Sequence, residues 1–293
     1  MIEAAAAETA SEGPLAIICG GGSLPFAVAD AVIKRGRRIL LFAIRGWADA
    51  RRVAGYPHHW ASVGQFGAFC RLARREGCRD VVFIGSMVRP AIWQLRPDFK
   101  TLRLLPRVFG IYRGGDDYLL KGVAAIFEEH GFHLLGAHAV APEILMPEGA
   151  LGRERPSERD HADIAKGLAL LSASSPFDVG QAVVVADAHV LAIEAAEGTD
   201  SMLARIAELR QSGRIAVASG RGVLVKAAKR DQDRRLDLPS IGLQTIEGAA
   251  RAGLAGIAVV AGSTIVAEPE RIGATADRAR LFGLGVREQA AET

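Results

Sequence analysis

The residues best suited to chemistry lie in 220–239, where an apolar run leads into a dense polar cluster. The run at 223–225 is typical of a buried strand, and basic and acidic side chains alternate after it. The basic residues are Arg221, Lys226, Lys229, Arg230, Arg234 and Arg235, and the acidic residues are Asp231, Asp233 and Asp237. Carboxylates bind hard cations such as Mg²⁺, while Lys and Arg neutralise phosphate oxygens, so the cluster indicates a phosphate-handling metal site. A solvated surface loop whose charges compensate one another is the alternative.

A second candidate is the glycine loop, Gly20, Gly21, Gly22 and Ser23, which stands between an expected strand and an expected helix. Backbone N–H groups and the helix dipole favour an anion at such a place. The dinucleotide pattern G-x-G-x-x-G is incomplete, and the next strand ends without an acidic residue for a ribose hydroxyl, which disfavours nicotinamide binding. The alternative is a tight turn and nothing more.

Two further acidic sites stand at expected helix starts. Asp116 and Asp117 follow two glycines, and Thr199 and Asp200 follow Gly198. Capping of the helix accounts for one residue of each pair and leaves the other for a ligand. The histidines form no metal-ligand pattern, and the chain contains no G-x-S-x-G motif, so serine-hydrolase chemistry is unsupported.

The segment 89–108 is basic and apolar. It places Ile92, Leu95, Phe99 and Leu102 on one helical face, although Pro97 and Pro106 interrupt the helix. A cationic amphipathic stretch lies on an anionic membrane or holds an acylated ligand with a charged headgroup. The alternative is a core-facing helix whose outer side is basic.

Composition limits the remaining possibilities. A length of 293 residues predicts two domains, and a hydrophobic content of 49% supports well-filled cores. A net charge of +3 and an aromatic content of 6% argue against nucleic-acid binding. Three cysteines without ligand spacing suit a reducing cytoplasm, and we find neither a secretory signal nor an apolar stretch long enough to span a membrane.

These residues require a scaffold that positions them, and the apolar periodicity predicts an α/β protein of two domains. Strands alternate with helices in residues 1–150, which predicts a Rossmann-like domain with a parallel sheet. We expect strands at 15–19, 38–44, 80–84 and 132–135, with helices at 25–35, 66–76 and 117–130. Residues 151–293 predict a mixed α/β domain. Its expected strands are 181–185, 190–194, 223–226, 256–260 and 264–266, and its expected helices are 162–172, one beginning at Thr199 or Asp200, 245–252 and 269–282.

Six segments together resemble one enzyme family over nearly the whole chain. They are GGGSLP (20–25), GSMVRP (85–90), GGDDYLLKGV (114–123), GQAVVV (180–185), EAAEGTD (194–200) and VKAAKRDQDRRLDLPSIG (225–242). The chain is similar to the UDP-2,3-diacylglucosamine pyrophosphatases of lipid A biosynthesis, of the type unrelated to calcineurin-like phosphoesterases. The segment 85–90 departs from the family pattern, since Ser86 and Met87 stand where a basic residue is common, so we expect Arg89 to supply that phosphate contact.

The resemblance implies Mg²⁺-dependent hydrolysis to UMP and 2,3-diacylglucosamine 1-phosphate, with water attacking the α-phosphorus and Mn²⁺ as an alternative metal. It implies two domains with the lipid held between them. We expect Asp233 and Asp237 to bind the metal, and Asp233, Asp237 and Asp200 to form the catalytic acidic site. The expected substrate contacts are Gly20, Gly21, Gly22, Ser23, Arg89, Asp116, Asp117, Thr199, Lys226 and Arg235.

Two alternatives to this hydrolase remain open: another nucleotide-sugar enzyme, and a non-catalytic carrier of an acylated sugar. The expected partners are the acylated UDP-sugar and, transiently, the inner-membrane surface, but not nucleic acid. A homodimer is left open. The expected location is the cytoplasm, with peripheral contact at the inner face of the cytoplasmic membrane.

Overall fold

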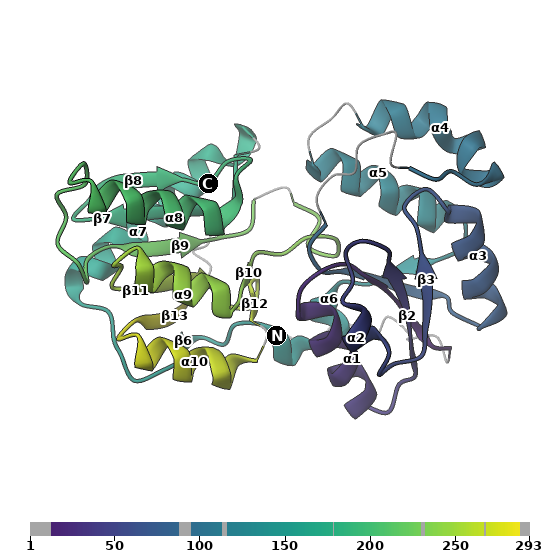
Figure 1. Cartoon of the computed structure of the whole chain (residues 1–293), viewed down its shortest axis with the longest axis horizontal. Coiled ribbons are helices and arrows are strands. Elements are labelled where there is room, and N and C mark those ends of the chain that lie inside the picture. Colours follow the sequence, from purple (N-terminus) through teal and green to yellow (C-terminus); the bar gives the residue numbers. More distant parts are fainter. Residues whose placement is uncertain are drawn as a thin grey trace, which may run out of the picture. The chain divides into compact units, whose positions relative to one another are not determined.

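The computed structural model describes residues 13–87, 95–112, 116–177, 179–229, 232–266 and 268–287. The chain divides into two compact units, Met1–Glu143 and Ile144–Thr293, each with its own sheet (Figure 1). No helix of the described ranges is both long enough and apolar enough to cross a membrane.

The first unit is built on a parallel sheet, which confirms the Rossmann-like prediction. Its strands are β1 (Leu15–Cys19), β2 (Ile39–Ile44), β3 (His58–Ala61), β4 (Asp80–Ile84) and β5 (His133–Leu134). They lie in the order β3-β2-β1-β4-β5, and every pair is parallel. The chain therefore changes direction across the sheet between β1 and β4, at whose carboxyl ends an open α/β sheet binds its ligands.

Helices of this unit pack on the sheet through apolar and aromatic side chains. They are α1 (Leu24–Lys34), α2 (Ala50–Val53), α3 (Phe66–Arg75), α4 (Phe99–Tyr112), α5 (Asp116–Glu129) and α6 (Ala137–Val140), followed by the 3-10 turn η2 (Pro142–Ile144). The Phe69 ring of α3 lies 4.6 Å from Phe42 of β2 and 5.0 Å from Phe127 of α5, measured between centroids. These aromatic contacts join α3, α5 and β2 in one core.

The start of α4 differs from the sequence prediction. Of the expected apolar face, Ile92 lies outside the described residues and Leu95 precedes the helix. The helix begins only at Phe99, because the carboxylate of Asp98 accepts hydrogen bonds from the N–H groups of Thr101 (2.9 Å) and Ala68 (2.8 Å). An acidic side chain that accepts from the first turn in this way fixes a helix start.

The second unit contains a mixed sheet, as predicted. Its strands, in spatial order, are β6 (Gly149–Ala150), β13 (Phe282–Val286), β11 (Gly256–Val260), β9 (Val223–Lys226), β7 (Ala182–Ala186) and β8 (His189–Ile193). The three central strands β13, β11 and β9 are parallel, and the outer pairings are antiparallel. A small parallel pair, β10 (Ser240–Ile241) and β12 (Ile265–Val266), stands apart.

Helices cover both faces of this sheet. They are α7 (Glu158–Ser174), which continues into η3 (Ser175–Phe177), α8 (Gly198–Gln211), α9 (Leu243–Arg251) and α10 (Pro269–Arg278). Alternate residues of a strand face opposite sides. Val223 and Val225 of β9 therefore pack with Ile164 of α7, while Leu224 packs with Met202 of α8 and Ile246 of α9.

The last expected helix was too long. The helix α10 ends at Arg278, and Arg280 follows with φ of 56°, a left-handed conformation that no helix continues through. Phe282 begins strand β13 instead of ending the helix. The prediction was wrong because the sequence FGLGV carries two glycines and so lacks the continuous apolar run of the other central strands.

Candidate active site

Three polar residues meet at one end of the second sheet because of strand direction. Lys226 ends β9 and pairs with Ala182 at the start of antiparallel β7, so Gln181 lies beside it. The next strand, β8, runs antiparallel to β7 and ends beside the same point, which brings in Glu194. A Cβ on Gly180 would lie 2.5 Å from Cγ of Glu194, so only glycine permits this approach.

Lys226 is the centre of this cluster. Its side chain is only 7% exposed, and its ammonium donates to Oγ1 of Thr199 (2.9 Å) and to the carbonyl of Ser240 (3.0 Å). Burial lowers the pKa of Lys226, and the nearby carboxylates of Glu194, Asp200 and Asp237 oppose that shift. Lys226 can neutralise a phosphate oxygen only where protons or further cations offset the carboxylates around it.

A hydrogen-bonded chain links Lys226 to Glu194. The hydroxyl of Thr199 donates to Oε1 of Glu194 (2.8 Å), and the other carboxylate oxygen accepts from the N–H of Gln181 (2.9 Å). The expected capping of this helix by Thr199 or Asp200 was wrong, because α8 begins earlier, at Gly198, after the N-cap residue Glu197. Thr199 therefore lies inside the helix, and its hydroxyl bridges two charged groups instead.

Asp237 is held by two amides. Its Oδ2 accepts from Nε2 of Gln181 (3.2 Å) and from Nε2 of Gln232, and the Gln181 amide also donates to Oε1 of Gln232 (2.8 Å). Burial raises the pKa of the Asp237 carboxyl, although the Gln181 hydrogen bond and the charges of Lys229 and Lys226 lower it in part. This carboxylate is thus oriented and partly withdrawn from water.

Asp233 and Arg235 bind each other. Nε of Arg235 lies 3.0 Å from Oδ1 of Asp233, and Nη2 lies 2.8 Å from Oδ2, a bidentate arrangement. The N–H of Asp237 donates to the carbonyl of Asp233 (3.2 Å), so the two aspartates stand at the ends of one short turn. The side chain of Arg235 is 43% exposed and that of Asp233 is 18% exposed. Action of either residue on a phosphate therefore requires this ion pair to rearrange.

The third acid expected in the catalytic site, Asp200, is exposed in the first turn of α8. The structure thus places Asp200 and Asp237 near one ammonium, that of Lys226. Glu194, Gln181 and Gln232 were not among the residues expected from the sequence. The available signal was position, since Gln181 begins one expected strand and Glu194 ends the next.

The glycine loop of the first unit is used mainly for backbone packing. The N–H of Gly20 donates to the carbonyl of Ile84 (2.9 Å), and Gly21 exchanges two hydrogen bonds with Ser86 (2.8 and 3.0 Å). A Cβ on Gly20 would lie 2.9 Å from the carbonyl carbon of Gly85. Because the first two amides already donate within the protein, an anion contact from this loop rests on Gly22, which is exposed, and on Ser23.

Three expected substrate contacts are not described by the structure. Arg89 lies outside the described residues. Asp116 and Asp117 open α5, but their side chains are likewise outside the described part of the chain. Their roles stay predictions.

The acidic groups fit a metal only in part. Among the described residues, no three His, Cys, Asp or Glu side chains form a ready-made metal site. Mg²⁺ commonly binds one or two carboxylates together with substrate phosphates, and its carboxylate ligands are themselves hydrogen-bonded. Asp237, anchored by two amides, and Asp233, at the other end of the same turn, fit that type of site.

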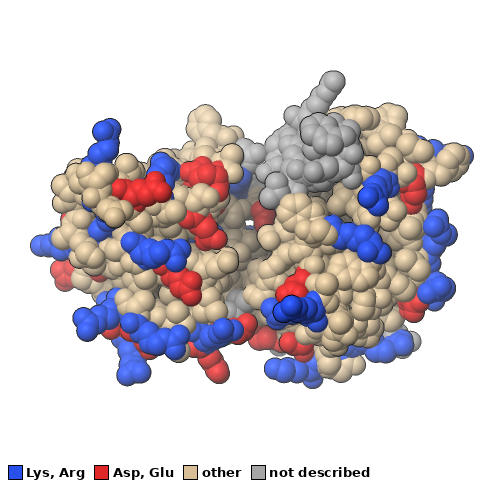
Figure 2. All heavy atoms as spheres, viewed as in Figure 1, with Lys and Arg blue, Asp and Glu red and all other residues tan. Residues whose placement is uncertain are grey.

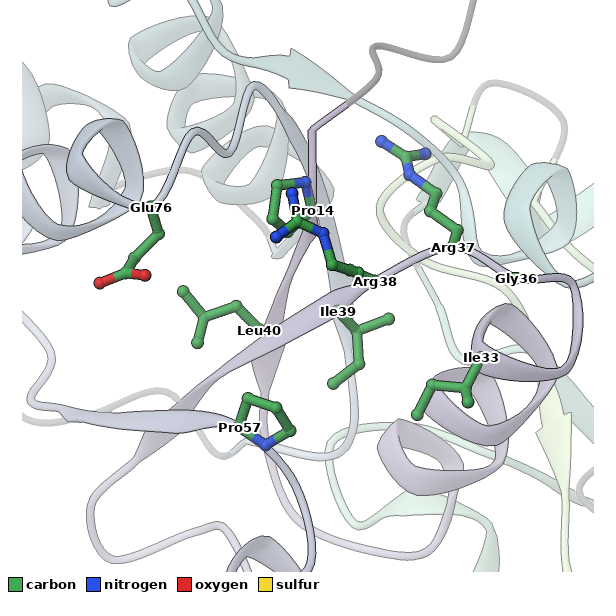
Figure 3. Close-up of a pocket in the computed structure, with 9 residues that line it drawn as sticks. All are labelled: Pro14, Ile33, Gly36, Arg37, Arg38, Ile39, Leu40, Pro57 and Glu76. Carbon is green, nitrogen blue, oxygen red and sulfur yellow. The ribbon is translucent and has the colours of Figure 1, made fainter.

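A hollow of about 430 Å³ in the first unit lies elsewhere (Figure 3). It is lined by Pro14, Ile33, Gly36, Arg37, Arg38, Ile39, Leu40, Pro57 and Glu76. Most of these residues adjoin the amino ends of β1, β2 and β3. Since open α/β sheets bind ligands at the carboxyl ends of their strands, we do not assign the substrate to this hollow.

Comparison with known proteins agrees with the two-unit architecture. The LpxI N-terminal domain family matches residues 14–144, and the LpxI C-terminal domain family matches residues 147–284. A protein of Caulobacter vibrioides, UDP-2,3-diacylglucosamine pyrophosphatase LpxI, is 42% identical over 275 residues, which cover 94% of this chain and 98% of the relative. The polar cluster around Lys226 lies within the matched C-terminal domain. The chain therefore belongs to the LpxI family.

Proposed function

We propose that the protein hydrolyses the pyrophosphate bond of UDP-2,3-diacylglucosamine, in lipid A biosynthesis, to UMP and 2,3-diacylglucosamine 1-phosphate. Family membership and the name of the Caulobacter relative support the substrate. The observation that carries the chemistry is the buried Lys226, with Thr199, Glu194 and Asp237 around it at the end of β9. Pyrophosphate cleavage needs such positive charge beside carboxylates that orient water.

In the proposed reaction, a water oxygen bonds to the α-phosphorus, and the bond from that phosphorus to the bridging oxygen breaks. The electron pair of that bond leaves with 2,3-diacylglucosamine 1-phosphate. Asp233, Asp237 and Asp200 form the acidic site, and a carboxylate of this site orients the water and accepts its proton. Lys226 and Arg235 offset the charge on the phosphoryl oxygens. Before it can do so, Arg235 exchanges its contact with Asp233 for a contact with phosphate.

We propose Mg²⁺, or Mn²⁺ in its place, bound by Asp233 and Asp237 together with phosphate oxygens. When bound, the metal would polarise the phosphoryl group. The proposal is testable without turnover, by electron paramagnetic resonance of Mn²⁺ titrated with the protein in the presence of UMP. Binding that weakens in both Asp233→Ala and Asp237→Ala, but not in Glu208→Ala on the exposed side of α8, supports it. Equal Mn²⁺ binding by the unsubstituted protein and all three variants would exclude Asp233 and Asp237 as metal ligands.

The substrate contacts proposed for the first unit are Gly22 and Ser23 of the glycine loop, with Gly20 and Gly21 shaping that loop. Arg89, Asp116 and Asp117 stay proposed contacts from the same unit. Thr199 is proposed to contact the substrate beside Lys226. The acyl chains imply that the protein meets its substrate at the inner face of the cytoplasmic membrane while residing in the cytoplasm. A homodimer stays a prediction.

Hydrolysis in ¹⁸O-labelled water tests this function. Purified protein with Mg²⁺ is expected to convert the substrate to the two products, with the label in the phosphate of UMP. Label found only in the lipid phosphate would refute attack at the α-phosphorus. Binding of intact substrate without cleavage would refute the enzyme and support a carrier of acylated sugar.

A further inference from the structure

One face of α4 carries large apolar side chains that the fold leaves exposed. Phe99 is 70% exposed, Leu102 is 47% exposed and Phe109 is 45% exposed, and Pro106 between them is exposed as well. At about 100° per residue, these four positions lie within an arc of about 80° and form one stripe. In Figure 2 the surface at the upper right, where α4 lies, is largely uncharged, with basic side chains and an acidic one beside it. Clustered exposed apolar side chains indicate a contact surface.

The opposite face of α4 is packed in the first unit, so the exposed stripe is not a misplaced core face. Thr101 is buried, and its hydroxyl accepts from the N–H of Phe66 in α3 (3.1 Å). Hydrogen bonds from Thr101 and Ala68 to Asp98 outweigh burial and lower the pKa of that carboxyl. The charged Asp98 therefore fixes the start of α4 and its rotation about its axis.

Basic side chains flank the stripe on one side. They are Lys100, Arg103 and Arg107, and the sequence of α4 contains no acidic residue. The guanidinium of Arg103 lies 4.6 Å from the ring centroid of Phe99, so charge and apolar surface are adjacent. Arg107 is paired with Glu129 of α5 (2.8 Å), and the ammonium of Lys100 lies against α3, 3.5 Å from Sγ of Cys70. Arg103 is therefore the exposed basic residue that adjoins the stripe. Tyr118 of α5, which packs against α4, is 59% exposed and adds aromatic surface.

We infer that the stripe Phe99, Leu102, Pro106 and Phe109 docks on an anionic lipid bilayer, with Arg103 at the headgroups. A helix with an apolar stripe and a cationic flank lies in the plane of such a surface. A symmetric contact between two copies fits less well, since it brings the same basic flanks together without an acidic residue on the helix. The inference rests on the proposed function in one respect, namely that a diacylated substrate resides in a membrane.

Sedimentation of the full chain with lipid vesicles tests this inference. The probes are vesicles of phosphatidylglycerol with phosphatidylcholine, and vesicles of phosphatidylcholine alone. We expect binding to the anionic vesicles at low salt and weak binding to the neutral ones, with loss of binding at high salt. We expect Phe99→Ser and Arg103→Glu each to lower the partition coefficient by about fivefold or more. For Arg103 the reason is that one basic residue near an anionic surface contributes about 1 kcal/mol to binding. For Phe99 the reason is the loss of its apolar side chain from the stripe.

Matched controls come from the second unit. Phe177→Ser removes a side chain that is 78% exposed in η3, and Arg251→Glu reverses an exposed charge in α9. Both are expected to bind vesicles as the unsubstituted protein does. Absence of binding to anionic vesicles at low salt, or equal binding by the α4 variants, would overturn the inference. So would a fall in oligomeric mass in Phe99→Ser without lipid, which would make the stripe a contact between copies.

Activity separates this inference from the proposed function. With substrate dispersed in nonionic detergent, Phe99→Ser and Arg103→Glu are expected to hydrolyse it at the unsubstituted rate, because no bilayer is required. Hydrolysis without vesicle binding would refute membrane docking and leave the enzyme intact. Vesicle binding without hydrolysis would refute the enzyme and leave the docking surface intact.

Discussion

Lys226 of β9 and Thr199 of α8 are joined by a hydrogen bond of 2.9 Å, and the same hydroxyl donates to Glu194 at 2.8 Å. One side chain therefore connects a buried ammonium to a carboxylate at the end of the neighbouring strand. Removal of that hydroxyl leaves a buried N–H donor of Lys226 without its acceptor. An unsatisfied buried donor lowers the free energy of unfolding by more than the net contribution of the hydrogen bond.

Substitution Thr199→Val is accordingly expected to lower the free energy of unfolding by about 1–3 kcal/mol. It is also expected to reduce turnover by about tenfold or more, since Lys226 loses its orientation. Thr199→Ser keeps the hydroxyl and should retain most of both properties. Urea unfolding and steady-state kinetics of the two variants check this, and equal behaviour of Val and Ser would contradict the bridging role.

Asp237 gives a prediction for pH dependence. Because burial raises its pKa above the ordinary value of 3.8, the folded state holds a proton that the unfolded state has released. This contribution to stability is complete below pH 3.8 and is lost as the pH rises through the folded-state pKa. Asparagine does not titrate, so Asp237→Asn does not lose stability in this way. As the pH rises above 3.8, the free energy of unfolding of Asp237→Asn should therefore increase relative to that of the unsubstituted protein. Its activity should fall.

Urea unfolding of both proteins at several pH values between about 4 and 7 measures that difference. Glu208→Gln, an exposed neutralisation on α8, serves as the control and should show little change. A difference between Asp237→Asn and the unsubstituted protein that stays constant across the range would contradict the raised pKa.

Arg235 is expected to act in substrate binding. Its guanidinium is bidentate on Asp233, and in the proposed reaction it moves to a phosphate. Arg235→Gln should raise KM by about tenfold to a hundredfold, as expected from loss of a charged hydrogen bond of about 1.5–3 kcal/mol. The neighbouring Arg234→Gln, also an exposed position, should change KM little. If the Arg234 variant showed the larger effect, the assignment of Arg235 would be wrong.

Substitution of Gly20 in the glycine loop is expected to affect the stability of the fold. Gly20→Ala places a Cβ 2.9 Å from the backbone of Gly85 and Ser86, so we expect a loss of about 2–4 kcal/mol in the free energy of unfolding. At Gly110, inside α4, a Cβ meets nothing within 4 Å, and Gly110→Ala should stabilise by up to about 1 kcal/mol. Thermal denaturation distinguishes the two, and an unchanged Gly20→Ala would refute the packing explanation.

Apolar periodicity predicted much of the fold and less of the site. Continuous runs such as β2 and β11 were recognised because buried strands need them. The edge strand β3 was missed, since its sequence HHWA is only half-buried. Gln181 and Gln232 were missed for another reason: an amide becomes significant only when the chain brings it to a carboxylate, and their separation of 51 residues hides that contact.

The pairing of Asp233 with Arg235 also could not be read from the sequence. Both residues were expected to act on a phosphate, and their spacing allows either separate action or the ion pair seen. By contrast, the proximity of Lys226 and Asp237 could be predicted, because both residues lie in the one segment 220–239. The extension of this group to Glu194 depends on strand order, which a single sequence does not specify.

If the turn from Asp233 to Asp237 carries out hydrolysis, substitution Asp233→Ala should abolish most of the activity. The measurement is turnover of UDP-2,3-diacylglucosamine together with its binding affinity, with Glu208→Ala as control. We predict that Asp233→Ala loses at least about a hundredfold in kcat while it still folds and binds substrate. A kcat of Asp233→Ala near that of the control would contradict the role of Asp233 in hydrolysis.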